Sequence, residues 1–198
     1  EQIEGALGRL DAARDVTGRE LTDLRAVGDW LLENAPPDSP SALVHGDYKP
    51  GNVFFEWTGR PELSGVVDWE AAFVGDPLTE LGYLLLYWRN GDDQPLSLED
   101  LDGRYHDEDL EDVRELDEDG LCPFTTEPGT PSRRELIDRY EDRTGYTFEH
   151  ERFYRAHAAF LLATVWEDLH RHQLEIGAES DYAPLVEYVT LRARDIVQ

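Results

Sequence analysis

Apolar side chains recur at helical spacing in several separate stretches of the chain. The first stretch predicts a helix over residues 19–34, with an apolar face made of Leu21, Leu24, Val27, Leu31 and Leu32. The same spacing predicts helices over residues 76–88, 150–176 and 181–198. Ser132 and Glu135 form a capping box, which predicts that another helix starts there. Pro77 suits the first helical position, and Asp76 is expected to cap that helix. The chain is therefore expected to be mostly helical.

Short apolar runs between the first two helices predict strands instead. These runs cover residues 42–45, 53–55 and 63–67, and the turn sequence Thr58-Gly59-Arg60-Pro61 joins the last two into a hairpin. A small sheet combined with many helices predicts an α+β fold.

Two segments carry a weaker pattern. Residues 1–17 are polar with a few small apolar side chains, which leaves open a frayed helix or the tail of a preceding segment. Residues 90–128 are rich in Asp and Glu and poor in large apolar groups. We expect an acidic surface insertion there, long and partly ordered, with one weak helix near residues 107–116.

The charge of the chain narrows its possible partners. Its 44 acidic and 18 basic residues give a net charge of −26, so a phosphate backbone would be repelled and nucleic acid is not expected as a partner. Lys49 is the only Lys; every other basic residue is Arg. An acidic, Lys-poor folded chain is typical of a halophilic protein, in which high salt screens repulsion between carboxylates.

The location of the protein is predicted from what the sequence lacks. Cys122 is the only Cys, which rules out an internal disulfide. No apolar run reaches the length of about 18 residues that a membrane span needs, and no secretion leader is visible. A cytoplasmic location without membrane contact is therefore expected.

One stretch concentrates the chemistry of the chain. The first strand leads into His45-Gly46-Asp47-Tyr48-Lys49-Pro50-Gly51-Asn52, and the third strand ends at Asp68. Asp47 could accept the proton of a hydroxyl group, while Asn52 and Asp68 offer the oxygen ligands that Mg²⁺ prefers. A base followed by two metal ligands is the layout of a phosphoryl-transfer site.

These residues, together with Val67-Asp68-Trp69-Glu70 and Gly75-Asp76-Pro77, resemble the aminoglycoside and choline phosphotransferase superfamily. Within it the chain is most similar to the kinase-like domains fused to acyl-CoA dehydrogenases. Residues 134–140 and 153–156 are similar to the same branch. The likeness covers about residues 20–195. It implies the mostly helical C-terminal lobe of a protein-kinase-like fold, with a small β-hairpin sheet carrying the catalytic loop.

The resemblance also implies roles for single residues. Asp47 would be the catalytic base, and Asn52 and Asp68 would bind Mg²⁺. Lys49 would contact the γ-phosphate of ATP. His45 and Asp76 would brace the catalytic loop. The function implied is an ATP-dependent phosphotransferase that transfers the γ-phosphoryl group to a hydroxyl of a small molecule.

Each of these residues also has a plain structural interpretation. Asp47 and Asn52 could hold turns, Asp68 could end a strand, Asp76 could only cap its helix, and Lys49 could be solvated. Glu167 and His170 resemble half of a di-iron site, but no second such pair is present, so we expect both on a helix surface.

Part of a complete kinase is missing from the sequence. No Gly-rich phosphate loop and no strand Lys precede Lys49, so we expect the N-terminal ATP-gripping lobe to be absent from this chain. An alternative to the enzyme is therefore a non-catalytic half-kinase that binds a ligand or partner. An apolar groove left by the missing lobe could drive self-association. The acidic residues of 90–128 favour a cationic acceptor such as an amine, although the whole chain is acidic.

Overall fold

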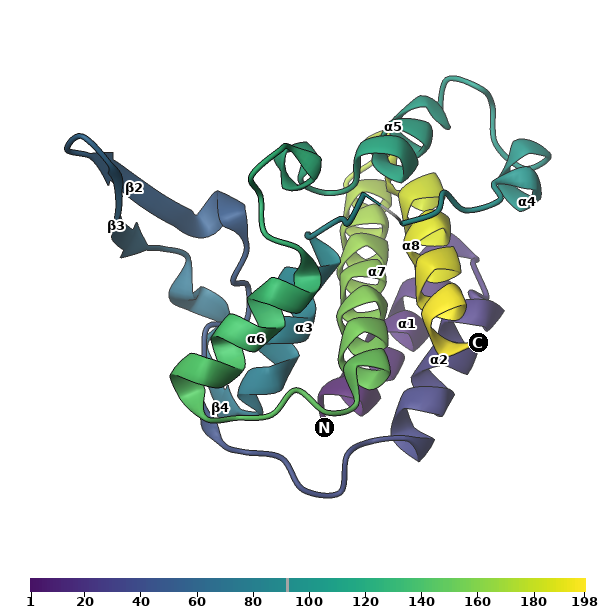
Figure 1. Cartoon of the computed structure of the whole chain (residues 1–198). Helices are drawn as coiled ribbons and strands as arrows, with labels where there is room; N and C mark the ends of the chain where they lie inside the picture. Colours follow the sequence, from purple (N-terminus) through teal and green to yellow (C-terminus); the bar gives the residue numbers. More distant parts are fainter. Residues whose placement is uncertain (92) are drawn as a thin grey trace.

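A long central helix organises the fold. The computed structural model describes residues 1–91 and 93–198, so residue 92 of the predicted insertion lies outside the described residues. Helix α7 (Glu151–Glu175) packs against four others, which are α1 (Gln2–Thr17), α2 (Thr22–Glu33), α3 (Pro77–Leu86) and α8 (Tyr182–Val197) (Figure 1). Its buried residues lie around most of its circumference, as expected for a helix enclosed by neighbours. The predicted mostly helical α+β class is confirmed.

The N-terminal segment is a regular helix rather than a frayed one. Ile3, Ala6, Leu10 and Ala13 of α1 are buried at helical spacing, and α1 packs along α7. The helix ends at Gly18, whose left-handed backbone lets its N–H reach the carbonyl of Arg14. Small residues on this face made the pattern weak in the sequence, although they suit close packing of two helices.

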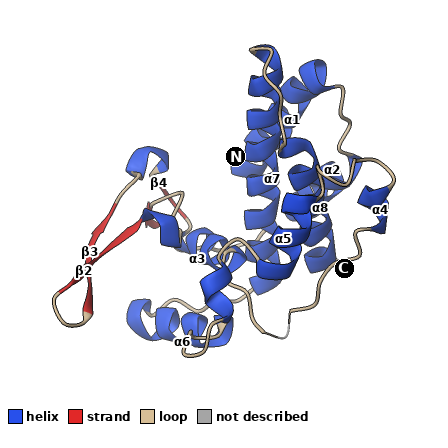
Figure 2. Ribbon diagram, turned by 90° about the horizontal axis from the view of Figure 1, so that it is seen from above, coloured by secondary structure: helices blue, strands red, loops and turns tan. Residues whose placement is uncertain are grey.

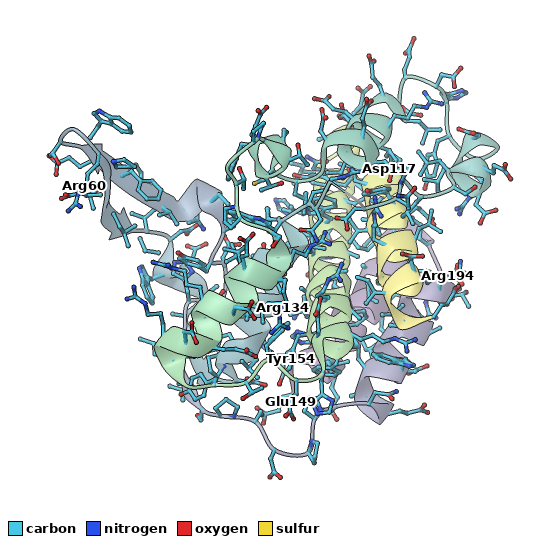
Figure 3. The ribbon with its side chains drawn as sticks, viewed as in Figure 1. Arg60, Asp117, Arg134, Glu149, Tyr154 and Arg194 are labelled. Atoms are coloured by element: carbon cyan, nitrogen blue, oxygen red, sulfur yellow. The ribbon has the colours of Figure 1, made fainter. Side chains whose placement is uncertain are left out.

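The strands form two separate pairs in the described part of the chain, not one small sheet. Strand β1 (Ala42–Val44) pairs antiparallel with β4 (Phe73–Gly75), which was not predicted. Strands β2 (Val53–Trp57) and β3 (Pro61–Val66) form the predicted hairpin. The hairpin projects away from the helices (Figure 2), and Arg60 lies at its far end (Figure 3).

The predicted acidic insertion is mostly exposed, and a few of its residues are anchored in the core. It contains the short helix α4 (Glu99–Asp102), helix α5 (Glu111–Asp119) and a 3₁₀ turn at Pro123–Thr126. Leu101, Leu110 and Val113 are fully buried in the main hydrophobic cluster, and α5 packs on α8. The acidic residues therefore cover the outer side of a segment that is anchored by its few apolar residues.

Helix α6 (Arg133–Thr144) follows and begins as predicted. The Ser132 hydroxyl accepts from the backbone of Glu135, and the Glu135 carboxylate accepts from the backbone of Ser132. This reciprocal capping box fixes where the helix starts. In the described residues no helix combines the length and apolar character needed to cross a bilayer.

The prediction that Glu167 and His170 lie on a helix surface is wrong. Glu167 is completely buried, 2.5 Å from Arg19 Nη1, and it accepts a hydrogen bond from the Thr17 hydroxyl at 3.0 Å. His170 is also buried, and its Nδ1 lies 2.7 Å from the Ser180 hydroxyl. Burial of these groups is stable because each has a partner. Glu167 joins the end of α1 and the α1–α2 connection to α7, and His170 joins the segment before α8 to α7.

Candidate functional site

The loop of residues 45–52 follows β1 and turns sharply at Gly46. Gly46 has φ +85°, and a Cβ atom built there would lie 2.4 Å from the carbonyl oxygen of Ala71. Only Gly fits both the left-handed backbone and this close approach. The turn presents the next residue, Asp47, to a cleft that is lined by the loop, α3 and α7.

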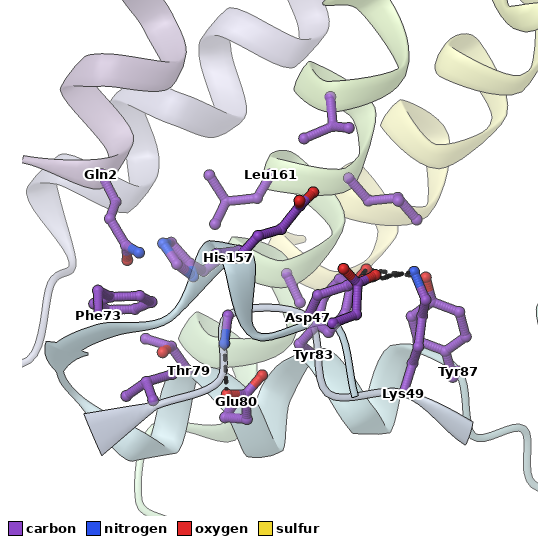
Figure 4. Close-up of a pocket in the computed structure, with 18 of the residues that line it drawn as sticks. Gln2, Asp47, Lys49, Phe73, Thr79, Glu80, Tyr83, Tyr87, His157 and Leu161 are labelled. Atoms are coloured by element: carbon purple, nitrogen blue, oxygen red, sulfur yellow. Dashed lines mark hydrogen bonds and ion pairs between the residues drawn. The ribbon is translucent and has the colours of Figure 1, made fainter. Parts of the chain in front are cut away.

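The Asp47 carboxylate is held by three side chains. Lys49 Nζ lies 2.8 Å from Oδ2 (Figure 4). The Tyr83 hydroxyl donates to Oδ1 at 2.8 Å, and Asn52 Nδ2 donates to Oδ2 at 2.9 Å. Burial acts to raise the pKa of Asp47, but the hydrogen bonds from Lys49, Tyr83 and Asn52 outweigh it and hold the pKa below its usual value. Asp47 is therefore ionised and fixed in orientation at neutral pH.

Tyr83 and Tyr87 extend this network along α3. Their hydroxyl oxygens are 3.0 Å apart, so Tyr83 connects Tyr87 to the carboxylate of Asp47. Burial is the largest cause that raises the pKa of Tyr83, and the neighbouring Tyr87 and Asp47 raise it further. Tyr83 thus stays neutral and acts as a hydrogen-bond donor.

Glu80 of α3 holds the backbone of the loop. Its two carboxylate oxygens accept the N–H groups of Gly46 at 2.9 Å and Tyr48 at 3.0 Å, on either side of Asp47. Such charge-assisted bonds are stronger than those between neutral groups. The sequence analysis missed Glu80 and both tyrosines. The available signal was the spacing of 80, 83 and 87, which puts all three on one helix face.

His45 connects the loop to the end of the hairpin. Its Nδ1 accepts the backbone N–H of Asp47 at 3.2 Å, so Nε2 carries the ring proton and donates to the carbonyl of Val67 at 2.8 Å. The ring also packs against Trp69, with centroids 4.5 Å apart. His45 therefore fixes the residue before Asp68 relative to Asp47.

Asp76 contacts the helices rather than the loop. Its Oδ1 accepts the N–H of Leu78, as expected of an N-cap, and its Oδ2 accepts the hydroxyl of Tyr154 on α7 at 2.7 Å. A Cβ atom at Gly82 would lie 2.6 Å from the Tyr154 carbonyl, so this glycine lets α3 approach α7 closely. Asp76 and Gly82 position the helix that carries Glu80 and Tyr83, while Glu80 is the direct brace of the loop.

A cleft of about 410 Å³ opens beside Asp47. We call it the loop cleft. One wall carries charged groups of the loop and its neighbours, which are Asp47, Lys49, Asp68, Glu70 and Glu80. The opposite wall comes from α7 and is largely apolar, with residues such as Leu161, Leu162 and Val165.

His157 is the titratable residue of the α7 wall (Figure 4). It is 3% exposed and stacks on Phe153. Burial lowers the pKa of His157 to about 4, so this wall stays uncharged near neutral pH.

Asn52 and Asp68 are the residues that fit a divalent metal. Asn52 is buried, and its Nδ2 donates to both the carbonyl and the carboxylate of Asp47, which leaves its oxygen Oδ1 as the possible ligand. Asp68 is exposed and has φ +68°, a left-handed conformation that is uncommon outside Gly and often marks functional sites. Its charge helps to raise the pKa of Lys49, although burial acts in the opposite direction.

This donor set suits Mg²⁺, which takes one or two protein oxygens and fills its remaining positions with water or phosphate. The described residues contain no group of three His, Cys, Asp or Glu side chains that would form a metal site from protein alone. The pair Asn52 and Asp68 is therefore suited to a metal that is shared with a phosphorylated ligand.

Sequence comparisons agree with the resemblance. The model of the phosphotransferase enzyme family matches residues 1–116. Acyl-CoA dehydrogenase family member 11 of Mus musculus is 31% identical over 150 residues, which are 73% of this chain and 16% of that protein. Viomycin phosphotransferase of Streptomyces vinaceus is 40% identical over 72 residues, 36% of this chain and 22% of that protein. The chain thus spans less than a quarter of each of these relatives.

The fold is also similar to a solved structure. A crystal structure of a Ralstonia eutropha JMP134 protein, assigned as an aminoglycoside phosphotransferase, aligns with a TM-score of 0.68 and 20% identity. The alignment covers 98% of this chain and 54% of that one. At this identity the likeness shows the fold alone. Because the family model covers more than half of its residues, the chain belongs to the phosphotransferase enzyme family.

Proposed function

We propose that this chain carries the catalytic loop of an ATP-dependent phosphotransferase that acts on a hydroxyl group of a small molecule. One observation supports this proposal most strongly. An ionised Asp47, fixed by Lys49, Tyr83 and Asn52, shares a cleft with the second carboxylate, Asp68.

Asp47 would act as the base. Its carboxylate would take the proton of the acceptor hydroxyl as the new oxygen–phosphorus bond forms and the bond to ADP breaks. The proton ends on Asp47 and the γ-phosphoryl group on the acceptor, while ADP leaves. A neutral Tyr83 and the amide of Asn52 would hold the carboxylate in line during this step.

Asn52 Oδ1 and the carboxylate of Asp68 would hold Mg²⁺. When bound, Mg²⁺ supplies positive charge that offsets the charge on the phosphate oxygens. The hydrogen bonds of Asn52 to Asp47 tie the position of this ligand to that of the base. The hydrogen bond from His45 to the carbonyl of Val67 likewise ties the position of the next residue, Asp68, to that of the base.

Lys49 would bridge the base and the transferred phosphate. Its ammonium group has three donors, and two of its contacts are to the oxygens of Asp47. Burial acts to lower the pKa of Lys49, but the hydrogen bond to Asp47 and nearby negative charge raise it above its usual value. It therefore stays charged and can donate to an anionic phosphate oxygen.

The proposal is tested with the natural protein that contains this chain. It is incubated with radiolabelled ATP, Mg²⁺ and a panel of hydroxylated metabolites, and label transfer is measured. Asp68→Asn is expected to lower transfer on the order of 100-fold, because one metal ligand loses its charge. Glu62→Gln, at an exposed carboxylate of the hairpin, is the matched control and should leave transfer unchanged.

Metal binding by the chain itself gives a second readout. Mn²⁺ replaces Mg²⁺ as a paramagnetic probe, and its affinity should fall in Asp68→Asn but not in Glu62→Gln. Equal transfer and equal Mn²⁺ affinity in the two variants would contradict the proposed metal site.

A further inference from the structure

A second cleft adjoins the loop cleft. It measures about 430 Å³ and lies where the end of α3 meets the 90–128 segment, α6, α7 and α8. Tyr87 lines both clefts. Its hydroxyl is hydrogen-bonded to the Tyr83 hydroxyl, which donates to Asp47. A molecule with one group at Asp47 could therefore extend past Tyr87 into the second cleft.

The second cleft is rich in arginine. The lining of the second cleft includes four arginines, which are Arg89, Arg133, Arg155 and Arg192. The carboxylates in its lining are Asp93 and Asp195. We call it the arginine cleft. In a chain of net charge −26, a concentration of guanidinium groups around one cavity is the opposite of the background.

Two of these arginines are fully engaged within the protein. Arg133 pairs with the carboxylate of Asp93 and donates to the Trp88 carbonyl. Arg192 pairs with Asp117 at 2.8 Å and donates to the Tyr188 hydroxyl at 2.9 Å. Asp117 lies where α5 meets α8 (Figure 3). These contacts fix two positive groups in the cleft wall.

Arg155 is different, because its hydrogen bonds are incomplete. Its Nη1 lies 3.3 Å from Glu151, whereas its Nε is buried and has no hydrogen-bond partner among the described residues. Burial lowers the pKa of Arg155, and the positive charge of Arg133 lowers it further. A buried donor without an acceptor is costly, and a bound anion would satisfy it.

We infer that the arginine cleft binds an anionic group, a carboxylate or a phosphate, carried by the acceptor whose hydroxyl meets Asp47. An anion beside Arg155 would accept from the unpaired Nε and would offset the repulsion between Arg155 and Arg133. Arg89, which also lines the cleft, adds a further guanidinium group. The inference rests on the proposed function for the identity of the ligand, and it favours an anionic acceptor over the amine suggested by the acidic 90–128 segment.

The anion site is tested by binding alone, without ATP. The Nε–H signal of Arg155 is followed by NMR during titrations of the chain with inorganic phosphate and with acetate, at constant ionic strength. Its assignment comes from its loss in Arg155→Lys. A saturable shift of this signal is expected with at least one anion. The affinity of each variant for that anion is measured by calorimetry, and Arg155→Gln should bind it about tenfold or more weakly than wild type. Arg60→Gln, on the exposed end of the hairpin, should not change it.

The two anions separate the two ligand sources. Stronger binding of phosphate points to a phosphorylated acceptor, and stronger binding of acetate to a carboxylic acid. If neither anion shifts the Arg155 signal, or if Arg155→Gln and Arg60→Gln bind alike, the inference is wrong. If Arg155→Gln does not fold, Arg155→Lys and the shift of the wild-type signal still decide the question.

Failure of this inference would differ from failure of the proposed function. If no anion binds while label transfer still depends on Asp68, the proposed arginine site is wrong and the proposed chemistry at Asp47 stands. If the anion binds as expected but no acceptor is phosphorylated, the arginine site is supported and the proposed phosphotransferase activity is contradicted.

Discussion

The loop of residues 45–52 and the helical bundle are stabilised in different ways. The loop is positioned by directional polar bonds from distant residues, including Glu80 to its backbone and Tyr83 to Asp47. The bundle around α7 is stabilised mainly by buried apolar side chains such as Leu31, Leu85 and Phe160. Its notable polar feature is the buried pair of Glu167 and Arg19.

This difference separates geometry from stability. A few hydrogen bonds fix where Asp47 points, but each contributes only about 1 kcal/mol net, or about 1.5–3 kcal/mol where a charge takes part. Apolar burial in the bundle contributes about 25 cal/mol per Å² and does not depend on direction. Substitutions in the bundle should therefore change stability most, and substitutions around the loop should change catalytic geometry.

The largest effect on stability is expected at Glu167. Glu167→Met leaves Arg19 without its closest carboxylate partner in a buried site, which should cost about 3–5 kcal/mol of unfolding free energy. The measurement is urea unfolding of the chain. Glu175→Gln, which breaks an exposed ion pair with Arg171 on the same helix, should cost under about 1 kcal/mol.

The double variant Arg19→Met/Glu167→Met sharpens this test. Replacing both charges by apolar groups is expected to recover much of the lost stability, since no unpaired charge remains buried. Equal unfolding free energies for Glu167→Met and Glu175→Gln would contradict the assignment of Glu167 as a buried anchor.

A smaller effect on stability is expected at Glu80. Glu80→Gln removes the charge from two backbone hydrogen bonds and keeps one acceptor oxygen, so the loss should be about 2 kcal/mol. Because these bonds flank Asp47, turnover should fall more than stability suggests. Unfolding and label transfer are measured on the same variant, with Glu33→Gln at the exposed end of α2 as the control. Turnover equal to that of Glu33→Gln would argue against Glu80 as the brace.

His157 makes the α7 wall sensitive to acid. Its folded-state pKa of about 4 lies below the ordinary value of 6.5, so below pH 6.5 the unfolded chain takes up a proton that the folded chain does not. Stability should therefore fall as the pH drops from 6.5 toward 4, with a contribution of about 2 kcal/mol at pH 5. His157→Leu should lose less stability than wild type between pH 7 and pH 5.

His172→Leu is the matched control for this prediction. It lies on the same helix and is exposed, so its loss should leave the pH dependence of unfolding as in wild type. If His157→Leu and wild type lose equal stability over this range, the buried neutral state of His157 is contradicted.

Sequence reasoning worked where the signal is local. Apolar periodicity predicted α2, α3, α7 and α8, and the capping box predicted the start of α6. The motif placed Asp47 and Asn52 on one loop, and the structure joins them by hydrogen bonds. These features depend on residues within a few positions of each other.

Contacts between distant residues were not predictable in this way. Tyr83 meets Asp47 across 36 residues, and Arg19 meets Glu167 across 148, without any periodic pattern that links the partners. The core role of the acidic 90–128 segment was hidden for a related reason. Its anchoring leucines, Leu101 and Leu110, are isolated among charged residues and form no continuous apolar face.

The most direct measurement is single-turnover phosphoryl transfer by the natural protein carrying Asp47→Asn. The substitution keeps the size of the side chain but removes its negative charge and its ability to take a proton. Transfer is expected to slow by about 10²–10⁴-fold, while Mn²⁺ affinity and the unfolding midpoint stay close to wild type. Asp38→Asn, at an exposed position, should behave as wild type. Undiminished transfer in Asp47→Asn would contradict the assignment of Asp47 as the base and the proposed mechanism with it.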